Sequence, residues 1–368
     1  MKANLRHAAG SLLVVGLEGK ELTALERAWL KLLRPGGVIL FRRNIVDWRQ
    51  TRALLAEAAA LCAPNALRCV DVEGGTVDRL RDALAPMPSA QAVAEVARRK
   101  GQSRLVREQG ELTAQGVRAF GFNTTLAPVL DLAKPESAEV MGTRSAAPDA
   151  AGVIEYAREF LACLAKHGVV GCGKHFPGLG SGSRDSHLET PAIQRGMRDL
   201  WREDLLPYRE LRTELPMIMV NHAAYPATPS KTHPASVSPY WISSVLRKRI
   251  GYRGLIFSDD MEMGGILKFM SIEQATVASI RAGMDLMEIC HSPELILRAY
   301  ESLIAESERS SAFKKLVLVR ADETARKRSI LFGGKPPSTP TPKQFEALRA
   351  RILTFKATTE KAREVQPA

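Results

Sequence analysis

The chain has 368 residues, of which 45% are hydrophobic and 25% are charged, as in an ordinary globular protein. This composition excludes a disordered, collagen-like or disulfide-scaffold protein, and no apolar run approaches the roughly 18 residues of a membrane span. The apolar stretch 11–17 lacks a cleavage site, and the five cysteines form no CxxC pair. We therefore expect a cytoplasmic protein with reduced thiols.

Short apolar segments alternate along the chain with longer amphipathic ones. The short segments predict eight strands, at 11–17, 37–41, 68–73, 124–131, 169–175, 217–222, 254–259 and 284–290. The amphipathic segments predict helices at 21–33, 48–61, 90–119, 150–166, 196–212, 239–250, 272–282 and 293–307. Eight strand–helix pairs predict an α/β protein with a (β/α)8 TIM-type barrel, a single domain over residues 1–334. A doubly wound open sheet is the alternative.

The C-terminal part carries most of the net charge of +12. Residues 314–368 hold thirteen basic and five acidic side chains, so the charge says little about the rest of the protein. After residue 309 the helical pattern weakens, and 335–342 holds four prolines, which is typical of a linker. Beyond it, apolar residues recur at helical spacing at Phe345, Leu348, Ile352 and Phe355. Residues 335–368 are therefore predicted to be a Pro-rich linker and a basic helical tail, which packs on the barrel or binds a partner or an anionic surface.

Ionisable residues gather where the predicted strands end. In a barrel of this type, the carboxyl ends of the strands form the catalytic face. Singly, each residue has a structural explanation, such as an aspartate that caps a helix, but their clustering indicates a site. Five successive strand ends supply Asp71 and Arg79, then Asp131 and Arg144, then Lys174, His175, Asp185 and His187, then His222, and finally Asp259 and Asp260.

These residue types suit the binding and cleavage of a sugar. A ligand rich in hydroxyls needs many donors and acceptors once it leaves water. Cleavage of a glycosidic bond with retention needs a carboxylate nucleophile and a proton donor, roles that Asp259 and the Asp185–His187 pair can fill. A hydrolytic metal site built from this pair and the nearby histidines is the alternative. Lys174 would repel a cation, so we expect neither a metal nor a cofactor.

Ordered motifs along the chain resemble one enzyme family. They are GGVILFRRN (36–44), DVEGG (71–75), LAPVLD (126–131), GTRS (142–145), KHFPGLG (174–180), DSH (185–187) and IFSDDM (256–261). Together they resemble glycoside hydrolase family 3, specifically its bacterial β-N-acetylglucosaminidases that act on peptidoglycan fragments. The resemblance extends over roughly residues 11 to 310.

The resemblance implies roles for individual residues. Asp259 would be the nucleophile, and His187, paired with Asp185, would be the general acid and base. The family's larger β-glucosidases instead take the proton donor from a second domain. The residues expected to bind the sugar are Asp71, Arg79, Arg144, Lys174 and His175 by resemblance, with His222 added from its place at a strand end.

The implied activity is that of a retaining exo-β-N-acetylglucosaminidase. It would remove non-reducing terminal GlcNAc from muropeptides derived from peptidoglycan, as a monomer without a nucleic-acid partner. One departure is Leu179, where the family commonly has a histidine, so a polar contact at the base of the loop is absent or replaced. A glycoside phosphorylase and a hydrolase of another β-glycoside are the enzymatic alternatives. A non-catalytic binding protein, whose basic tail engages nucleic acid or an anionic polymer, is the alternative from another class.

Overall fold

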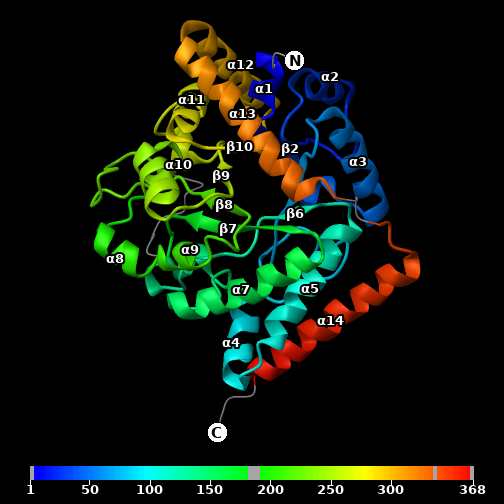
Figure 1. The fold of residues 1–368 in the computed structure, drawn as a ribbon. Coiled ribbons are helices and arrows are strands. Elements are labelled where there is room, and N and C mark those ends of the chain that lie inside the picture. Colours follow the sequence, from blue (N-terminus) through cyan, green and yellow to red (C-terminus); the bar gives the residue numbers. More distant parts are fainter. Residues whose placement is uncertain (1–3, 181–190, 335–337, 365–368) are drawn as a thin grey trace.

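The computed structural model describes residues 4–180, 191–334 and 338–364, and its centre is a closed barrel of eight parallel strands (Figure 1). Because β1 pairs with both β2 and β10, the sheet closes and the open-sheet alternative is wrong. The predicted (β/α)8 barrel is confirmed, and every barrel strand overlaps one predicted segment. The strands in order around the barrel are β1 (Leu13–Gly16), β10 (Leu286–Ile289), β9 (Leu255–Asp260), β8 (Met217–Val220), β7 (Val170–Phe176), β6 (Thr124–Thr125), β3 (Leu67–Val70) and β2 (Gly37–Ile39).

Helices cover the outside of the barrel. Side-chain caps fix several of their starts, including capping boxes at Thr23 and Ser271. The helices are α1 (Leu5–Gly10), α2 (Ala24–Leu33), α3 (Trp48–Leu61), α4 (Ala90–Lys100), α5 (Arg104–Ala119), α6 (Ala138–Met141), α7 (Ala150–Lys166), α8 (Met197–Arg202), α9 (Leu206–Glu210), α10 (Gly264–Leu267), α11 (Ile272–Ala282), α12 (Pro293–Arg309), α13 (Ser311–Phe332) and α14 (Pro342–Glu364). Shorter or wider helical turns are η1 (Arg42–Asn44), η2 (Pro135–Ser137), η3 (Ala235–Val237) and η4 (Tyr240–Arg249). None of the helices in the described ranges is long and apolar enough to cross a membrane.

Two predicted helices are each divided in two. The segment 90–119 forms α4 and α5, because Gly101 takes a left-handed conformation with φ of 59° and ends α4. The segment 196–212 forms the short helices α8 and α9, and Pro207 stands in the first turn of α9. The prediction of single helices was wrong at both places.

Helix α13 is continuous where the sequence pattern weakens. Its buried face begins with Phe313 and Val317 but continues with Thr324 and Arg328, which hide the apolar periodicity. Arg328 is 1% exposed, and its Nη1 donates a hydrogen bond of 3.0 Å to the carbonyl of Gly36. A charged side chain therefore holds this helix against the barrel.

Side chains alternate between the barrel interior and the helices. Leu286 of β10 and Cys290 directly after it belong to the interior cluster, whereas Met287 and Ile289 of β10 belong to the cluster under the helices. Glu288 falls between Leu286 and Cys290 on the interior side. The interior positions nearest the carboxyl ends of the strands form the floor of the site described below.

The C-terminal helix α14 lies across α4 and α5, red in Figure 1. Its ion pairs to the barrel helices join Arg351 to Glu111 and Arg363 to Glu95. The Phe345 ring lies 5.8 Å from the rings of both Trp48 and Phe120. The buried residues of the helix are Phe345, Leu348, Ile352, Phe355 and Thr359. The division of the chain at residue 334 stays a prediction.

Replacing Phe345 with alanine should loosen α14, because it removes a ring that is 6% exposed. A Phe→Ala change at a buried site costs about 3 kcal/mol. Hydrogen exchange of α14 should accelerate, and denaturant unfolding should shift to lower concentration. Leu353→Ala is the matched control, because Leu353 is 46% exposed on the same helix. Equal exchange rates in the two variants would show that this face does not hold the helix.

Candidate active site

A cavity of about 410 Å³ opens at the carboxyl ends of the strands. Strands β2, β7, β8, β9 and β10, the β4–β5 hairpin and the loop before α7 all contribute to its wall. The predicted site residues that line it are Asp71, Arg79, Arg144, Lys174, His175 and Asp259. Residues separated by almost 190 positions in the chain thus meet at one face, as the barrel geometry requires.

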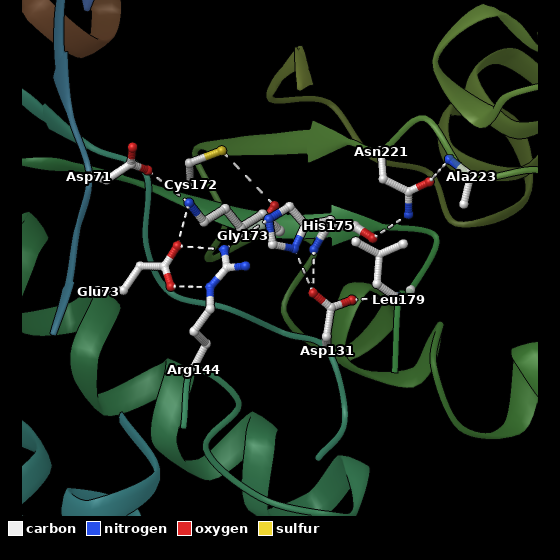
Figure 2. Close-up of polar contacts among 12 residues, drawn as sticks. Asp71, Glu73, Asp131, Arg144, Cys172, Gly173, His175, Leu179, Asn221 and Ala223 are labelled. Atoms are coloured by element: carbon white, nitrogen blue, oxygen red, sulfur yellow. Dashed lines mark hydrogen bonds and ion pairs between the residues drawn. The ribbon is translucent and has the colours of Figure 1, made fainter. Parts of the chain in front are cut away.

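A network of buried ions forms one side of the cavity. The Nζ of Lys174 lies 2.9 Å from Oδ1 of Asp71 and 2.6 Å from Oε1 of Glu73. Arg144 donates two hydrogen bonds to Glu73, of 2.7 and 2.8 Å, and Figure 2 shows the two side chains facing each other. Arg79 lies 3.5 Å from Asp71. A paired, bidentate arrangement of this kind fixes the orientation of each side chain.

Neighbouring opposite charges keep the buried side chains of this network in their charged forms. Burial disfavours the charged form of Lys174, but Asp71 and Glu73 outweigh it and raise the pKa of Lys174. Burial alone would raise the pKa of Glu73, yet Arg144 and Lys174 lower it well below its ordinary value. Lys174 and Glu73 are therefore both ionised at neutral pH. Glu73 was not among the predicted site residues. Its position two residues after Asp71 could have indicated it, because side chains two positions apart in an extended segment point to the same side.

A glycine turn places Asp71 and Glu73. They flank Val72 at the start of a small hairpin of β4 (Val72–Gly74) and β5 (Val77–Asp78). Gly74 has a φ of 90°, and a Cβ there would lie 2.2 Å from the carbonyl oxygen of Pro88. The tight turn is therefore a requirement of the site and not only a connection.

Asp131 holds His175 and the start of the following loop. One of its carboxylate oxygens accepts hydrogen bonds from Nδ1 of His175, at 2.6 Å, and from the backbone N–H of the same residue, at 3.1 Å. The other oxygen accepts from the backbone N–H of Leu179 at 2.6 Å (Figure 2). Because a carboxylate oxygen only accepts, Nδ1 of His175 is the donor, and Nε2 of the same ring lies 3.3 Å from Nη2 of Arg144. The side chain of Leu179 is buried and lines the cavity, so this part of the wall is apolar.

Asp259 presents a carboxylate to the cavity from the end of β9. Burial raises its pKa, but His175, His222 and Lys174 outweigh burial and lower it below the ordinary value. The backbone N–H of Asp260 donates to Oδ1 of Asp259 at 3.0 Å. Asp259 is thus an ionised, oriented carboxylate, as a nucleophile must be.

His222 is fully buried and is not part of the cavity wall that the structure describes. Its Nδ1 is 2.7 Å from Oγ of Ser236, and its Nε2 is 3.0 Å from the carbonyl oxygen of Asp260. This arrangement suits a residue that positions Asp259. A direct contact between His222 and the sugar stays a prediction.

Three potential metal ligands lie close together at the cavity, Asp260, Glu262 and His291, and the first and last of them line it. Their contacts give them a different role. Glu262 accepts hydrogen bonds from the backbone N–H groups of Cys290 and Ser292, and Arg43 lies 2.9 Å from Nδ1 of His291. Burial and then Glu262 raise the pKa of Asp260 to about 7. These side chains hold the loop after β10.

The predicted acid/base pair, Asp185 and His187, lies outside the described residues. The roles assigned to both residues therefore stay predictions.

The sequence matches the model of the glycosyl hydrolase family 3 N-terminal domain over residues 4–316. The chain belongs to glycoside hydrolase family 3. It is a glycoside hydrolase, as the resemblance implied.

Relatives of known name support this assignment. A β-hexosaminidase of Alkalilimnicola ehrlichii is 39% identical over 287 residues, which cover 77% of this chain and 82% of the relative. A β-hexosaminidase of Thioalkalivibrio sulfidiphilus is 38% identical over 299 residues, covering 80% and 85%.

Solved structures have the same fold. The family 3 β-N-acetylglucosaminidase of Paenibacillus sp. superposes with a TM-score of 0.84 at 29% identity, covering 96% of this chain and 69% of that one. NagZ of Neisseria gonorrhoeae in complex with N-trifluoroacetyl-D-glucosamine superposes with a TM-score of 0.77 at 29% identity, covering 94% and 98%.

Replacing Glu73 with glutamine should destabilise the protein by about 3 kcal/mol, because Lys174 and Arg144 stay buried without their shared carboxylate. The pKa of Glu73 is lowered by folding, so its contribution is present above about pH 4.3 and is lost as the pH falls below that value. Denaturant unfolding of both proteins at pH 7 and below pH 4 should therefore show a difference that shrinks in acid. Asp82→Asn, in an exposed pair with Arg42, should change little at either pH. A difference independent of pH would contradict the ionised state of Glu73.

Proposed function

We propose that this enzyme is a retaining exo-β-N-acetylglucosaminidase that removes terminal GlcNAc from muropeptides in the cytoplasm. The observation that carries the proposal is Asp259, an ionised carboxylate on the wall of a cavity whose other groups suit a sugar. The names of the relatives, β-hexosaminidase and β-N-acetylglucosaminidase, favour a 2-acetamido sugar. A cavity of about 410 Å³, closed below by the packed barrel, suits one terminal sugar and hence exo action.

Binding and reaction use different parts of the cavity. Asp71, Lys174 and Arg144 offer hydrogen bonds to sugar hydroxyls while their mutual ion pairs keep them in place. Their geometry exists before the substrate arrives, so little order is lost on binding.

Two displacements at the anomeric carbon would follow. Asp259 attacks that carbon, the glycosidic oxygen takes a proton from His187, and a covalent glycosyl–enzyme ester forms as the aglycone leaves. Water then gives a proton back to His187 and attacks the same carbon, which releases Asp259 as a carboxylate. Two inversions give retention. Asp185 would orient the imidazole and favour its protonated form.

Replacing Asp259 with alanine should lower kcat/KM on 4-nitrophenyl β-N-acetylglucosaminide by at least about 1,000-fold, since the variant lacks the attacking carboxylate. Asp199→Ala, an exposed residue on α8, is the control and should retain activity. Proton NMR of the first product formed should show the β-anomer. Wild-type turnover in the Asp259 variant, or an α-anomer as first product, would refute the proposed mechanism.

Replacing His187 with alanine should slow substrates according to their leaving group. Activated aryl glycosides need little protonation, so their hydrolysis should fall much less than that of a GlcNAc–anhydromuramyl peptide. The measurement is kcat/KM on both substrates, with added azide as a substitute nucleophile for the second step. Equal losses on the two substrates would argue against His187 as the proton donor.

The same assay identifies the acceptor and the sugar. Hydrolysis yields free GlcNAc at a rate independent of phosphate, whereas a phosphorylase would yield GlcNAc-1-phosphate at a rate that rises with phosphate. A panel of aryl β-glucoside and β-xyloside substrates tests the alternative sugars. Faster cleavage of any of these than of the GlcNAc glycoside would overturn the proposed specificity.

A further inference from the structure

Glu288 is an acidic residue in the interior of the barrel. It lies on β10 between the interior residues Leu286 and Cys290, is 2% exposed and lines the cavity. The interior cluster on this side of the strand also contains Cys69, Cys172 and Cys290. An apolar residue would be the ordinary choice at such a position.

One oxygen of the Glu288 carboxyl group, Oε1, is buried and has no hydrogen-bond partner in the part of the chain that the structure describes. The hydrogen bond to Oγ of Ser258 comes from the backbone N–H of Glu288 and leaves the side chain unused. A buried polar atom without a partner destabilises a protein by about 1 to 3 kcal/mol. Such a group is expected where a ligand completes it.

The surroundings of Glu288 make it a hydrogen-bond donor. Burial, and then the negative charges of Asp260, Asp71 and Asp259, raise its pKa well above the ordinary value. These surroundings favour the protonated form of the group. A protonated carboxyl group has one O–H to donate, in contrast to the carboxylate of Glu73, which only accepts.

We propose that Glu288 is a substrate-binding residue that donates a hydrogen bond to the acetamido carbonyl of the sugar in the cavity. The inference rests on the proposed function and adds a specificity determinant to it. Glu288 is on the strand next to Asp259, and its pairing partner in the sheet is Asp260. It therefore reaches the part of the ring beside the attacked carbon, which carries the acetamido group on one side and the ring oxygen on the other.

The acetamido carbonyl fits a donor better than the ring oxygen does. Positive charge develops on the ring oxygen in the transition state, and a donor there would oppose it. An amide carbonyl is a strong neutral acceptor, and its bond to Glu288 persists throughout the reaction. Because Glu288 lies in the barrel interior, the aglycone, which points to the open end of the cavity, is out of its reach.

The test compares two variants on two substrates. Glu288→Gln keeps the shape and an N–H donor, whereas Glu288→Leu removes the polar group. On 4-nitrophenyl β-N-acetylglucosaminide, kcat/KM should fall about 10- to 100-fold in Glu288→Leu and by less than about 3-fold in Glu288→Gln. The corresponding glucoside, which has no acetamido group, should show little loss in either variant. If hydrolysis of the glucoside is too slow to measure, the inhibition constants of free GlcNAc and glucose replace the two substrates. Glu288→Leu should then weaken inhibition by GlcNAc and leave inhibition by glucose unchanged.

Measurements of the Tm and of the pH dependence of KM distinguish a role of Glu288 in binding from a role in folding. Glu288→Leu should raise the Tm while it lowers activity, because it removes a buried unpaired polar group. In the wild type, KM for the GlcNAc substrate should rise with pH as Glu288 ionises, and in Glu288→Gln this rise should be absent. Met287→Leu, on the helix-facing side of the same strand, is the matched control and should leave the ratio of the two substrates unchanged.

The outcomes are distinct. If the wild type cleaves neither substrate, the proposed function fails. If the wild type is active but Glu288→Leu keeps its preference for the GlcNAc substrate, or loses both activities equally, the assignment of Glu288 is wrong.

Discussion

The buried charges around Glu73 constrain the whole active face. Lys174 and Arg144 come from a strand and a loop on one side of the barrel, and Glu73 comes from a hairpin after another strand. An isolated ion at these positions would be costly, so the hairpin, β7 and the loop before α7 can take only the arrangement that pairs all three. The same ion pairs that offset the cost of burying these charges also hold the sugar-binding side chains in fixed positions.

Packing, rather than charge, explains the basic tail. Surface pairs such as those of Arg351 and Arg363 contribute little to stability. The buried stripe that includes Phe345 supplies the main contact, and the cations find acidic partners on α4 and α5 of the same chain. A net charge of +12 therefore does not by itself indicate an anionic ligand.

The sequence predicts the barrel because strands buried on both faces are apolar throughout and alternate with amphipathic helices. It fails at α13, where Arg328 interrupts the apolar pattern by bonding to a carbonyl distant in the chain. In the site, motif residues such as Lys174 are predictable. Asp131 falls in the predicted cluster at the strand ends, but its hydrogen bonds to His175 and Leu179 depend on another strand and are not predicted. Glu288 is not predicted as a site residue, because its role depends on the lack of a partner, and periodicity carries no such information.

Three carboxyl groups at the ends of β9 and β10 show how position determines chemistry. Asp259 has cationic neighbours that lower its pKa, so it is a carboxylate able to attack. Asp260, one residue on, faces Glu262, and its pKa is about 7. Burial and the carboxylates of Asp260, Asp71 and Asp259 raise the pKa of Glu288 well above its ordinary value. Carboxyl groups thus supply both a nucleophile, Asp259, and a hydrogen-bond donor, Glu288, within one cavity. A matching substrate has an electrophilic carbon for the first group and a neutral acceptor beside that carbon for the second. A 2-acetamido sugar has that combination, whereas a simple glucoside offers only a hydroxyl at the second position.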